Sequence, residues 1–152
     1  MVDVVDAAKR SSMMAGIRGK DTKPELLLRR ALHALGFRYR LQVRALPGRP
    51  DMMLPRYRAV VFINGCFWHR HEGCRLATNP ATRPDFWAAK FEQNVARDRR
   101  NITALCDLGW RVAVVWECDL KRNASSVVRD LADWLRAEED QSASGKGFSS
   151  SC

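Results

Sequence analysis

The sequence predicts a single α/β domain with a central mixed β-sheet flanked by helices, and three observations favour this class. At 152 residues, the chain has the length of one domain. Its apolar fraction of 46% is ordinary for a globular protein. Helical and strand-like patterns follow one another as a helix, a group of strands, and then helix, strand and helix.

The first elements are predicted from their end signals and apolar spacing. Residues 1–20 are polar and basic, and we expect a short helix or a mobile arm there. A helix should begin near Thr22, with Pro24 in its first turn, and should end at Gly36. Residues 37–44 alternate between apolar and polar side chains, which predicts a half-buried strand.

The remaining pattern supplies the other strands and helices. A short strand is predicted at 51–54, and apolar runs at 59–63 and 110–116 indicate buried strands. Proline opens a long helix over 84–108, and a last amphipathic helix is expected over 125–137. The chain therefore divides into an N-terminal arm (1–20), a folded domain (21–138) and a Ser/Gly-rich tail (139–152) that should be disordered.

The charge balance points to a polyanionic partner. The chain carries 26 Lys and Arg against 17 Asp and Glu, a net charge of +9 with a pI near 9.9. Such a balance favours nucleic acid, although a protein that is merely basic is the alternative. No apolar run approaches the roughly 18 residues that a membrane span needs, and the N-terminus lacks a secretory signal. We therefore expect a cytoplasmic protein without a membrane partner.

Cysteine and histidine concentrate in residues 65–74. The pattern Cys66-x4-His71-x2-Cys74 has the tight ligand spacing of a zinc site. Five cysteines are an odd number, and two of them lie close to histidines, so reduced thiols fit this chain better than disulfides. The sequence therefore predicts a bound zinc ion.

A fourth zinc ligand is needed, and three cysteines are candidates. Cys152 lies in the tail, and Cys106 lies in the long helix, where it is expected to pack as a small apolar residue. Cys118 follows a buried strand, where a loop can turn toward the Cys66 loop, so it is favoured. Four protein ligands predict a structural zinc rather than a catalytic one.

Asp51 is a candidate ligand for a second metal. It stands at the mouth of a predicted strand, and the buried strand beside it ends at Ile63. Two such strands can direct a carboxylate and a main-chain carbonyl at one point, and hard oxygen ligands suit Mg²⁺. Since Pro-Asp is also a common turn dipeptide, an ordinary turn is the alternative.

Asp98 falls on the apolar stripe of the long helix, where an unpaired carboxylate would be costly. One interpretation is a structural salt bridge with a neighbouring arginine. The other is an acid that orients a histidine, and His69 is the natural partner because His71 has the ligand spacing. A carboxylate behind an imidazole fixes its tautomer and strengthens it as a base.

Two pairs of large aromatic residues lie near these groups. Phe86 and Trp87 are expected to pack on the long helix. Phe67 and Trp68 follow a Gly-Cys turn and lack the spacing of a helix or strand face, so they are candidate wedges of the kind that insert between base steps.

Four motifs then occur in a distinctive order: Leu46-Pro47-Gly48-Arg49-Pro50-Asp51, Gly65-Cys66-Phe67-Trp68-His69, Asn94-Val95-x-Arg97-Asp98-Arg99-Arg100, and Gly109-Trp110-Arg111-Val112 with Val115-Trp116-Glu117-Cys118. Together they closely resemble the very-short-patch-repair (Vsr-type) mismatch endonucleases of bacteria, over about residues 6–137. The resemblance implies a restriction-endonuclease-like fold. It also implies an enzyme that nicks one strand of duplex DNA beside a T:G mismatch arising from deaminated 5-methylcytosine.

The resemblance further implies roles for individual residues. Asp51 and the main-chain carbonyl of Ile63 would hold Mg²⁺, and His69 would activate water with Asp98 behind it. Glu25 matches another active-site acid. The rings that intercalate from the major groove match Phe67, Trp68 and Trp87, whereas Met14 matches a residue that reaches from the minor-groove side. The zinc ligands match Cys66, His71, Cys74 and Cys118.

The expected partner is double-stranded DNA with a T:G mismatch, bound by a monomer. A functional link to mismatch-repair proteins and to a cytosine-5 DNA methyltransferase is also expected. Two rival interpretations remain open: a sequence-specific restriction-type nuclease of the same fold, and a zinc-containing module that binds DNA without cutting it.

Overall fold

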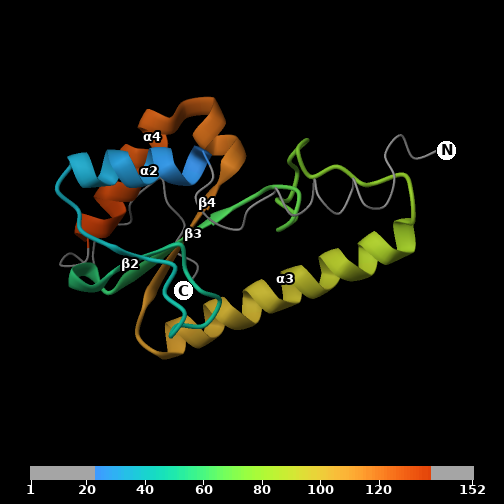
Figure 1. The fold of residues 1–152 in the computed structure, drawn as a ribbon, viewed down its shortest axis with the longest axis horizontal. Helices are drawn as coiled ribbons and strands as arrows, with labels where there is room; N and C mark the ends of the chain where they lie inside the picture. The colour runs from blue at the N-terminus through green and yellow to red at the C-terminus, as the bar shows by residue number, and fades with distance from the viewer. Residues whose placement is uncertain (1–22, 138–152) are drawn as a thin grey trace.

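The computed structural model describes residues 23–137, and its four strands form one mixed sheet in the order β1-β2-β3-β4 (Figure 1). The strands are β1 (Arg40–Leu41), β2 (Met52–Leu54), β3 (Ala59–Asn64) and β4 (Arg111–Trp116). The pairs β1–β2 and β2–β3 are antiparallel, whereas β3 and β4 run parallel. The prediction of an α/β domain with a mixed sheet is thus confirmed.

Helices cover both faces of the sheet (Figure 1). The helices α2 (Lys23–Ala34) and α4 (Glu117–Arg136) lie together on one face, and α3 (Pro84–Asp107) lies on the other. A 3-10 turn, η1 (Pro55–Tyr57), joins β2 to β3. The strands β3 and β4 are parallel neighbours, so the chain between them must return over one face of the sheet, and α3 is part of that crossover connection.

Alternation along the strands divides the apolar side chains between two cores. Met52 and Val61 are fully buried on the side of α2 and α4. Met53 and Val60 occupy the opposite face, where they pack with Leu105 of α3. The sheet is therefore apolar on both faces, and its polar groups are confined to strand ends and loops.

The strand predicted over 37–44 is wrong in length, since only β1 forms there. Phe37 is buried in the larger core, and the Tyr39 hydroxyl donates a hydrogen bond to the Arg29 carbonyl at 2.8 Å. Gln42 then adopts a left-handed φ of 49°, which ends the extended backbone. Tertiary packing of the aromatic rings, rather than strand pairing, thus accounts for the apolar positions of this segment.

The last helix begins eight residues earlier than 125, because α4 starts at Glu117 and continues through a break at Asn123. Asn123 has a non-helical φ of −156°, and its side-chain oxygen accepts a hydrogen bond from the Ser126 N–H at 3.1 Å. This is N-cap geometry, so the predicted helix is the second half of α4. Cys118 consequently lies in the first turn of a helix and not in a loop.

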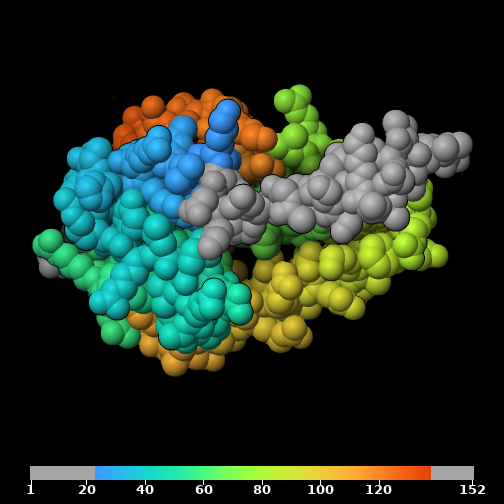
Figure 2. Space-filling view, in the orientation of Figure 1, coloured from blue at the N-terminus to red at the C-terminus, as the bar shows by residue number. Residues whose placement is uncertain are grey.

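The long helix agrees with its prediction and reaches beyond the sheet. Its C-terminal part packs on the sheet through Leu105, and Gly109 follows it with a φ of 89°. Figure 2 shows its N-terminal half projecting from the body of the molecule together with the segment that follows β3. The two are in contact, since the Asn94 side chain donates a hydrogen bond to the Trp68 carbonyl at 3.3 Å.

The expected N-terminal arm (1–20) and C-terminal tail (139–152) lie outside the described residues. Within residues 23–137, no helix combines the length and the apolar character that crossing a membrane requires.

Candidate functional site

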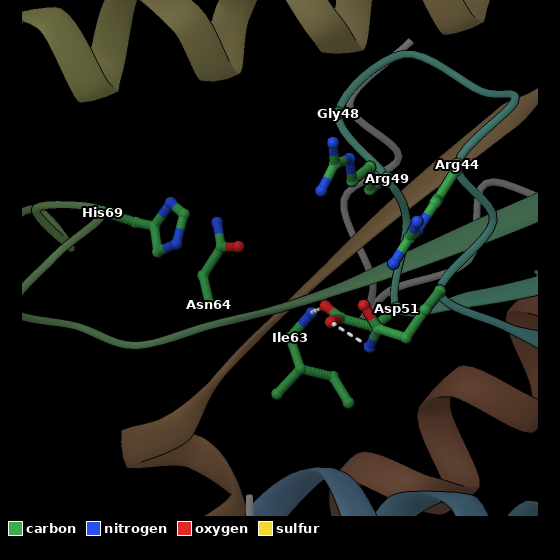
Figure 3. Close-up of a pocket in the computed structure, with 8 residues that line it drawn as sticks. Arg44, Gly48, Arg49, Asp51, Ile63, Asn64 and His69 are labelled. Atoms are coloured by element: carbon green, nitrogen blue, oxygen red, sulfur yellow. Dashed lines mark hydrogen bonds between the residues drawn. The ribbon is translucent and has the colours of Figure 1, made fainter. Parts of the chain in front are cut away.

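A cavity of about 430 Å³ opens where β2, β3 and the segment after β3 meet (Figure 3). Polar and charged side chains dominate its lining, which also includes one glycine and one isoleucine: Gln42, Arg44, Gly48, Arg49, Asp51, Ile63, Asn64 and His69. Asp51, Ile63 and His69, three of the predicted site residues, therefore share one pocket.

Asp51 is held at the centre of this pocket by two hydrogen bonds (Figure 3). Its Oδ2 accepts a bond from the Ile63 N–H at 2.6 Å, and its Oδ1 accepts one from Gln42 Nε2 at 3.4 Å. Burial raises the pKa of Asp51 to about 6, and nearby Glu25 adds to the rise, while the two hydrogen bonds and His69 oppose it. A carboxylate in this state is stabilised by any cation that enters the pocket.

Glu25 is linked to Asp51 through the side chain of Gln42. It is 2% exposed, pairs with Arg29 one helical turn along α2, and accepts a hydrogen bond from Gln42 Nε2 at 3.0 Å. Gln42 thus bridges Glu25 and Asp51. Sequence reasoning missed Gln42, because its position depends on the left-handed backbone that ends β1.

His69 faces the pocket and is paired with an acid from α3. Its Nδ1 lies 2.6 Å from Asp98 Oδ2, and both side chains are about one-quarter exposed, at 28% and 25%. With Nδ1 engaged, the other ring nitrogen points toward Asn64 and the cavity (Figure 3). This arrangement suits an imidazole that accepts a proton from a water molecule in the pocket.

The predicted metal ligands Cys66, His71, Cys74 and Cys118 come together in one cluster. Their ligand atoms all lie within 4.8 Å of one another, and His71 Nδ1 is 3.6 Å from Cys66 Sγ and 3.3 Å from Cys118 Sγ. Zinc bonds of about 2.0–2.3 Å would space tetrahedral ligands roughly 3.5 Å apart. The donor set and its spacing therefore fit a four-coordinate zinc ion.

Neighbouring contacts orient these ligands. The His71 ring stacks on Trp116 with centroids 4.2 Å apart, and the Cys66 N–H donates to Glu117 Oε1 at 3.1 Å. Burial raises the pKa of the Cys66 thiol to about 12, a cost to its thiolate that a bound cation would remove. Cys106 packs instead against the smaller core, and it is not one of the cluster's ligands. It is disulfide-bonded, so the expectation of reduced thiols is wrong for this cysteine, whereas Cys66, Cys74 and Cys118 are free.

The aromatic residues of the segment after β3 do not project singly. Phe67 lies 5.0 Å from Trp68, 5.9 Å from Trp87 and 5.2 Å from Phe91, measured between ring centroids. Phe91 of α3 is 7% exposed and also belongs to this cluster. Phe86 was expected to pack on the helix, yet it is 48% exposed, because its part of α3 extends beyond the sheet.

Arg70 packs against this aromatic cluster. Its guanidinium carbon lies 4.0 Å from the Phe91 ring centroid, and its nitrogens donate to the carbonyl oxygens of Phe67, Ala77 and Thr78. The rings and the His69–Asp98 pair are thus carried by one short segment and α3, and the Cys/His cluster joins that segment to α4 through Cys118. Met14, the remaining predicted contact residue, lies outside the described residues.

Comparisons with known proteins agree with the geometry. Residues 2–75 match the family model described as DNA mismatch endonuclease Vsr. The chain is 45% identical over 142 residues to the DNA mismatch endonuclease Vsr of Escherichia coli K12, covering 91% of this chain and 90% of that protein. It is 48% identical over 120 residues to the type II nicking enzyme V.XorIIP of Xanthomonas oryzae, covering 79% and 88%. A type II nicking enzyme of Neisseria meningitidis, V.NmeAIP, is 42% identical over 139 residues.

Proposed function

Because this chain belongs to the Vsr family and is a DNA endonuclease, we propose that it nicks one strand of duplex DNA beside a T:G mismatch. The nick would begin very short patch repair of deaminated 5-methylcytosine. The observation that carries this proposal is the His69–Asp98 pair at 2.6 Å, which faces the Asp51 pocket from the segment that bears the aromatic cluster.

The residues of the pocket fit a divalent cation. The Asp51 carboxylate lies against the Ile63 main chain, so Asp51 and the Ile63 carbonyl would hold Mg²⁺. When bound, Mg²⁺ would supply positive charge that stabilises the five-coordinate phosphorus of the transition state and the leaving oxygen. Without a cation, the ionised Asp51 would instead repel a phosphate, which supports a requirement for metal.

Hydrolysis follows from the groups around Asp51. His69 accepts a proton from water, the water oxygen bonds to phosphorus, and one phosphorus–oxygen bond of the DNA backbone breaks. The leaving oxygen takes up a proton from solvent. Asp98 holds the imidazole in the tautomer that leaves the nitrogen nearer the cavity free to accept that proton. Glu25, through Gln42, holds Asp51 in place.

Mismatch selectivity would come from the aromatic cluster. Phe67, Trp68 and Trp87 would insert from the major groove, and Met14 would approach from the minor groove. Unstacking a base step costs a few kcal/mol, and a mispaired step costs less. Zinc bound by Cys66, His71, Cys74 and Cys118 would keep the segment rigid, so that insertion also positions His69.

The remaining expectations belong to the same proposal. The fold would be of the restriction-endonuclease type, with 1–20 as a DNA-contacting arm, 21–138 as the nuclease domain and 139–152 as a disordered tail. The protein would act as a monomer in the bacterial cytoplasm. It would work beside mismatch-repair proteins and a cytosine-5 DNA methyltransferase.

A nicking assay tests the proposal. End-labelled duplexes that differ only in a T:G or C:G pair are incubated with protein and Mg²⁺ and resolved on a denaturing gel. We expect a nick in the T strand of the mismatched duplex alone. His69→Ala should slow it by about 10²–10⁴-fold, and Asp98→Asn by a smaller factor.

The rival interpretations predict other results in this assay. Equal cutting of both duplexes would indicate a restriction-type nuclease, and binding without any cutting would indicate a DNA-binding module. The Asp51→Asn variant is the control, because it should bind the duplex yet leave it intact. Cleavage that survives Asp51→Asn would exclude the proposed active site.

A further inference from the structure

Two arginines line the active-site pocket, and none of the roles proposed above involves them. Arg44 and Arg49 come from the loop between β1 and β2, and both guanidinium groups enter the cavity opposite His69 (Figure 3). Among residues 23–137, neither side chain forms an ion pair or a hydrogen bond. Two permanent positive charges therefore face a pocket whose one carboxylate is Asp51.

The backbone that carries Arg49 is strained and tightly held. Arg49 adopts a left-handed φ of 48°, which side chains rarely adopt, and Gly48 before it has a φ of 76°. The Arg49 N–H closes the turn on the Leu46 carbonyl at 3.2 Å. A Cβ added at Gly48 would lie 3.0 Å from Asn101 Cβ on α3, so the turn is seated directly on that helix. The fold thus accepts strain at a residue whose side chain enters the site.

The geometry of the guanidinium donors favours one class of ligand. An arginine fork matches the paired oxygens of a phosphate, and an unpaired guanidinium in a partly enclosed pocket keeps its donors available. An arginine that only added to the basic surface would not need a left-handed backbone to direct it inward. The ligand indicated is a phosphodiester group placed between the arginines and the His69 ring.

We propose that Arg49, assisted by Arg44, binds the phosphodiester that is cut and stabilises the charge that grows on its non-bridging oxygens. This inference rests on the nuclease function proposed above. The two guanidinium groups supply positive charge to the phosphate, and the cation that Asp51 and the Ile63 carbonyl would hold would add to it. Neither arginine exchanges a proton, so the bond-breaking step keeps the balance given above.

Two substitutions at Arg49 separate this role from a structural one. Arg49→Ala removes the fork, and Arg49→Gly also relieves the left-handed backbone. In single-turnover nicking with saturating protein, each should be about 10²-fold slower than wild type. The melting temperature of Arg49→Gly should nevertheless equal or exceed that of wild type. Arg129→Ala, an exposed arginine on α4, removes the same charge and should cut within about twofold of wild type.

Two outcomes of this comparison overturn the proposal. One is cleavage by Arg49→Gly within about threefold of wild type. The other is a rate loss in Arg49→Gly accompanied by a marked fall in melting temperature, because that pattern belongs to a structural residue. Guanidinium added at millimolar concentration should partly restore cleavage to Arg49→Ala and should leave Asp51→Asn inactive.

A binding measurement tests the contact between Arg49 and the phosphate separately from the nuclease function. Single phosphates near the T:G mismatch are replaced in turn by neutral methylphosphonates, and duplex affinity is measured with Ca²⁺ in place of Mg²⁺. Wild type should lose about tenfold or more at one position, and Arg49→Gly should show no loss there. An equal loss in both proteins overturns the proposal, even if the wild type cuts no duplex at all. If wild type cuts normally and both proteins lose the same affinity, the proposed contact between Arg49 and the phosphate is wrong and the nuclease function is unaffected.

Discussion

At the scale of the residue, the site shows a conflict between stability and chemistry at Asp51. The carboxylate is half-buried beside Glu25, and its pKa is raised to about 6. A folded protein that holds an ionised carboxylate in such a place is less stable than it would be with a neutral group. The same environment favours binding of a cation at Asp51, which the proposed chemistry requires.

The stability cost of Asp51 can be measured through pH. The folded pKa of about 6 exceeds the ordinary value of 3.8, so the cost is full above pH 6 and vanishes as pH falls toward 4. Without added Mg²⁺, Asp51→Asn should be about 1–3 kcal/mol more stable than wild type at pH 7.5 and equal to it near pH 4. Urea denaturation at the two pH values gives both differences.

Asp133→Asn on α4 is the control for that experiment, since it changes an exposed carboxylate and should alter stability little at either pH. An Asp51→Asn variant that is less stable than wild type at pH 7.5 would contradict the interpretation. It would mean that the hydrogen bonds from Ile63 and Gln42 outweigh the cost of burial.

Residue-scale inference from the sequence succeeded where periodicity carried the information. The 3.6-residue repeat of the long helix put Asp98 on the inward stripe and so demanded a partner, and the structure brings it to His69 at 2.6 Å. Gln42 could not be found in this way. It lies in an alternating segment, and only its left-handed φ of 49° turns its amide toward Glu25 and Asp51.

At the scale of the element, the segment between β3 and α3 packs against two helices through its residues 66–74. The Cys/His cluster links its start to the first turn of α4, and the aromatic cluster links it to α3. Little regular secondary structure forms in this segment. Its order must therefore come from side-chain contacts and from any metal bound by the cluster.

Removal of one cluster ligand should loosen this whole segment. We expect Cys118→Ser to lose most of its bound zinc, measured by elemental analysis, and about 2–4 kcal/mol of stability. Cys106→Ser is the control for zinc content alone, because Cys106 is disulfide-bonded and packs on the smaller core, so its loss should leave the zinc content near one per chain. The reverse result would show that the wrong cysteine has been assigned to the site.

Element boundaries were predicted well where Gly or Pro marks them and poorly elsewhere. Pro84 and Gly109 enclose α3 as expected. The start of α4 at Glu117 has no such marker, and the break at Asn123 resembles a helix start in sequence. Since a capped residue inside a kinked helix has the same local chemistry as a true N-terminus, local signals cannot separate the two.

At the scale of the whole molecule, the net charge of +9 is the property that bears most directly on DNA. Contacts from Lys and Arg to phosphates release counterions, so affinity falls steeply with salt. We expect binding to a 20–30 base-pair duplex to weaken by about 100-fold or more between 50 and 200 mM salt. Fluorescence anisotropy at several salt concentrations measures the slope.

Matched and mismatched duplexes should give the same salt slope, because phosphate contacts carry no information about the bases. The mismatch should shift the affinity alone. A slope close to zero would show that the positive charge does not face DNA. A slope that differs strongly between the duplexes would show that mismatch reading depends on extra phosphate contacts rather than on the aromatic cluster.

The sequence by itself determined the α/β fold class, the buried strands and the spacing of the candidate metal ligands Cys66, His71 and Cys74. These follow from periodicity, end signals and ligand spacing, which are local properties of the chain. Only the tertiary structure decided which groups share a cavity. Gln42, Arg44 and Arg49 share the cavity with Asp51 because left-handed residues turn the β1–β2 loop and α3 supports that loop. Such turns depend on contacts between residues far apart in the chain, and the spacing of neighbours does not record them.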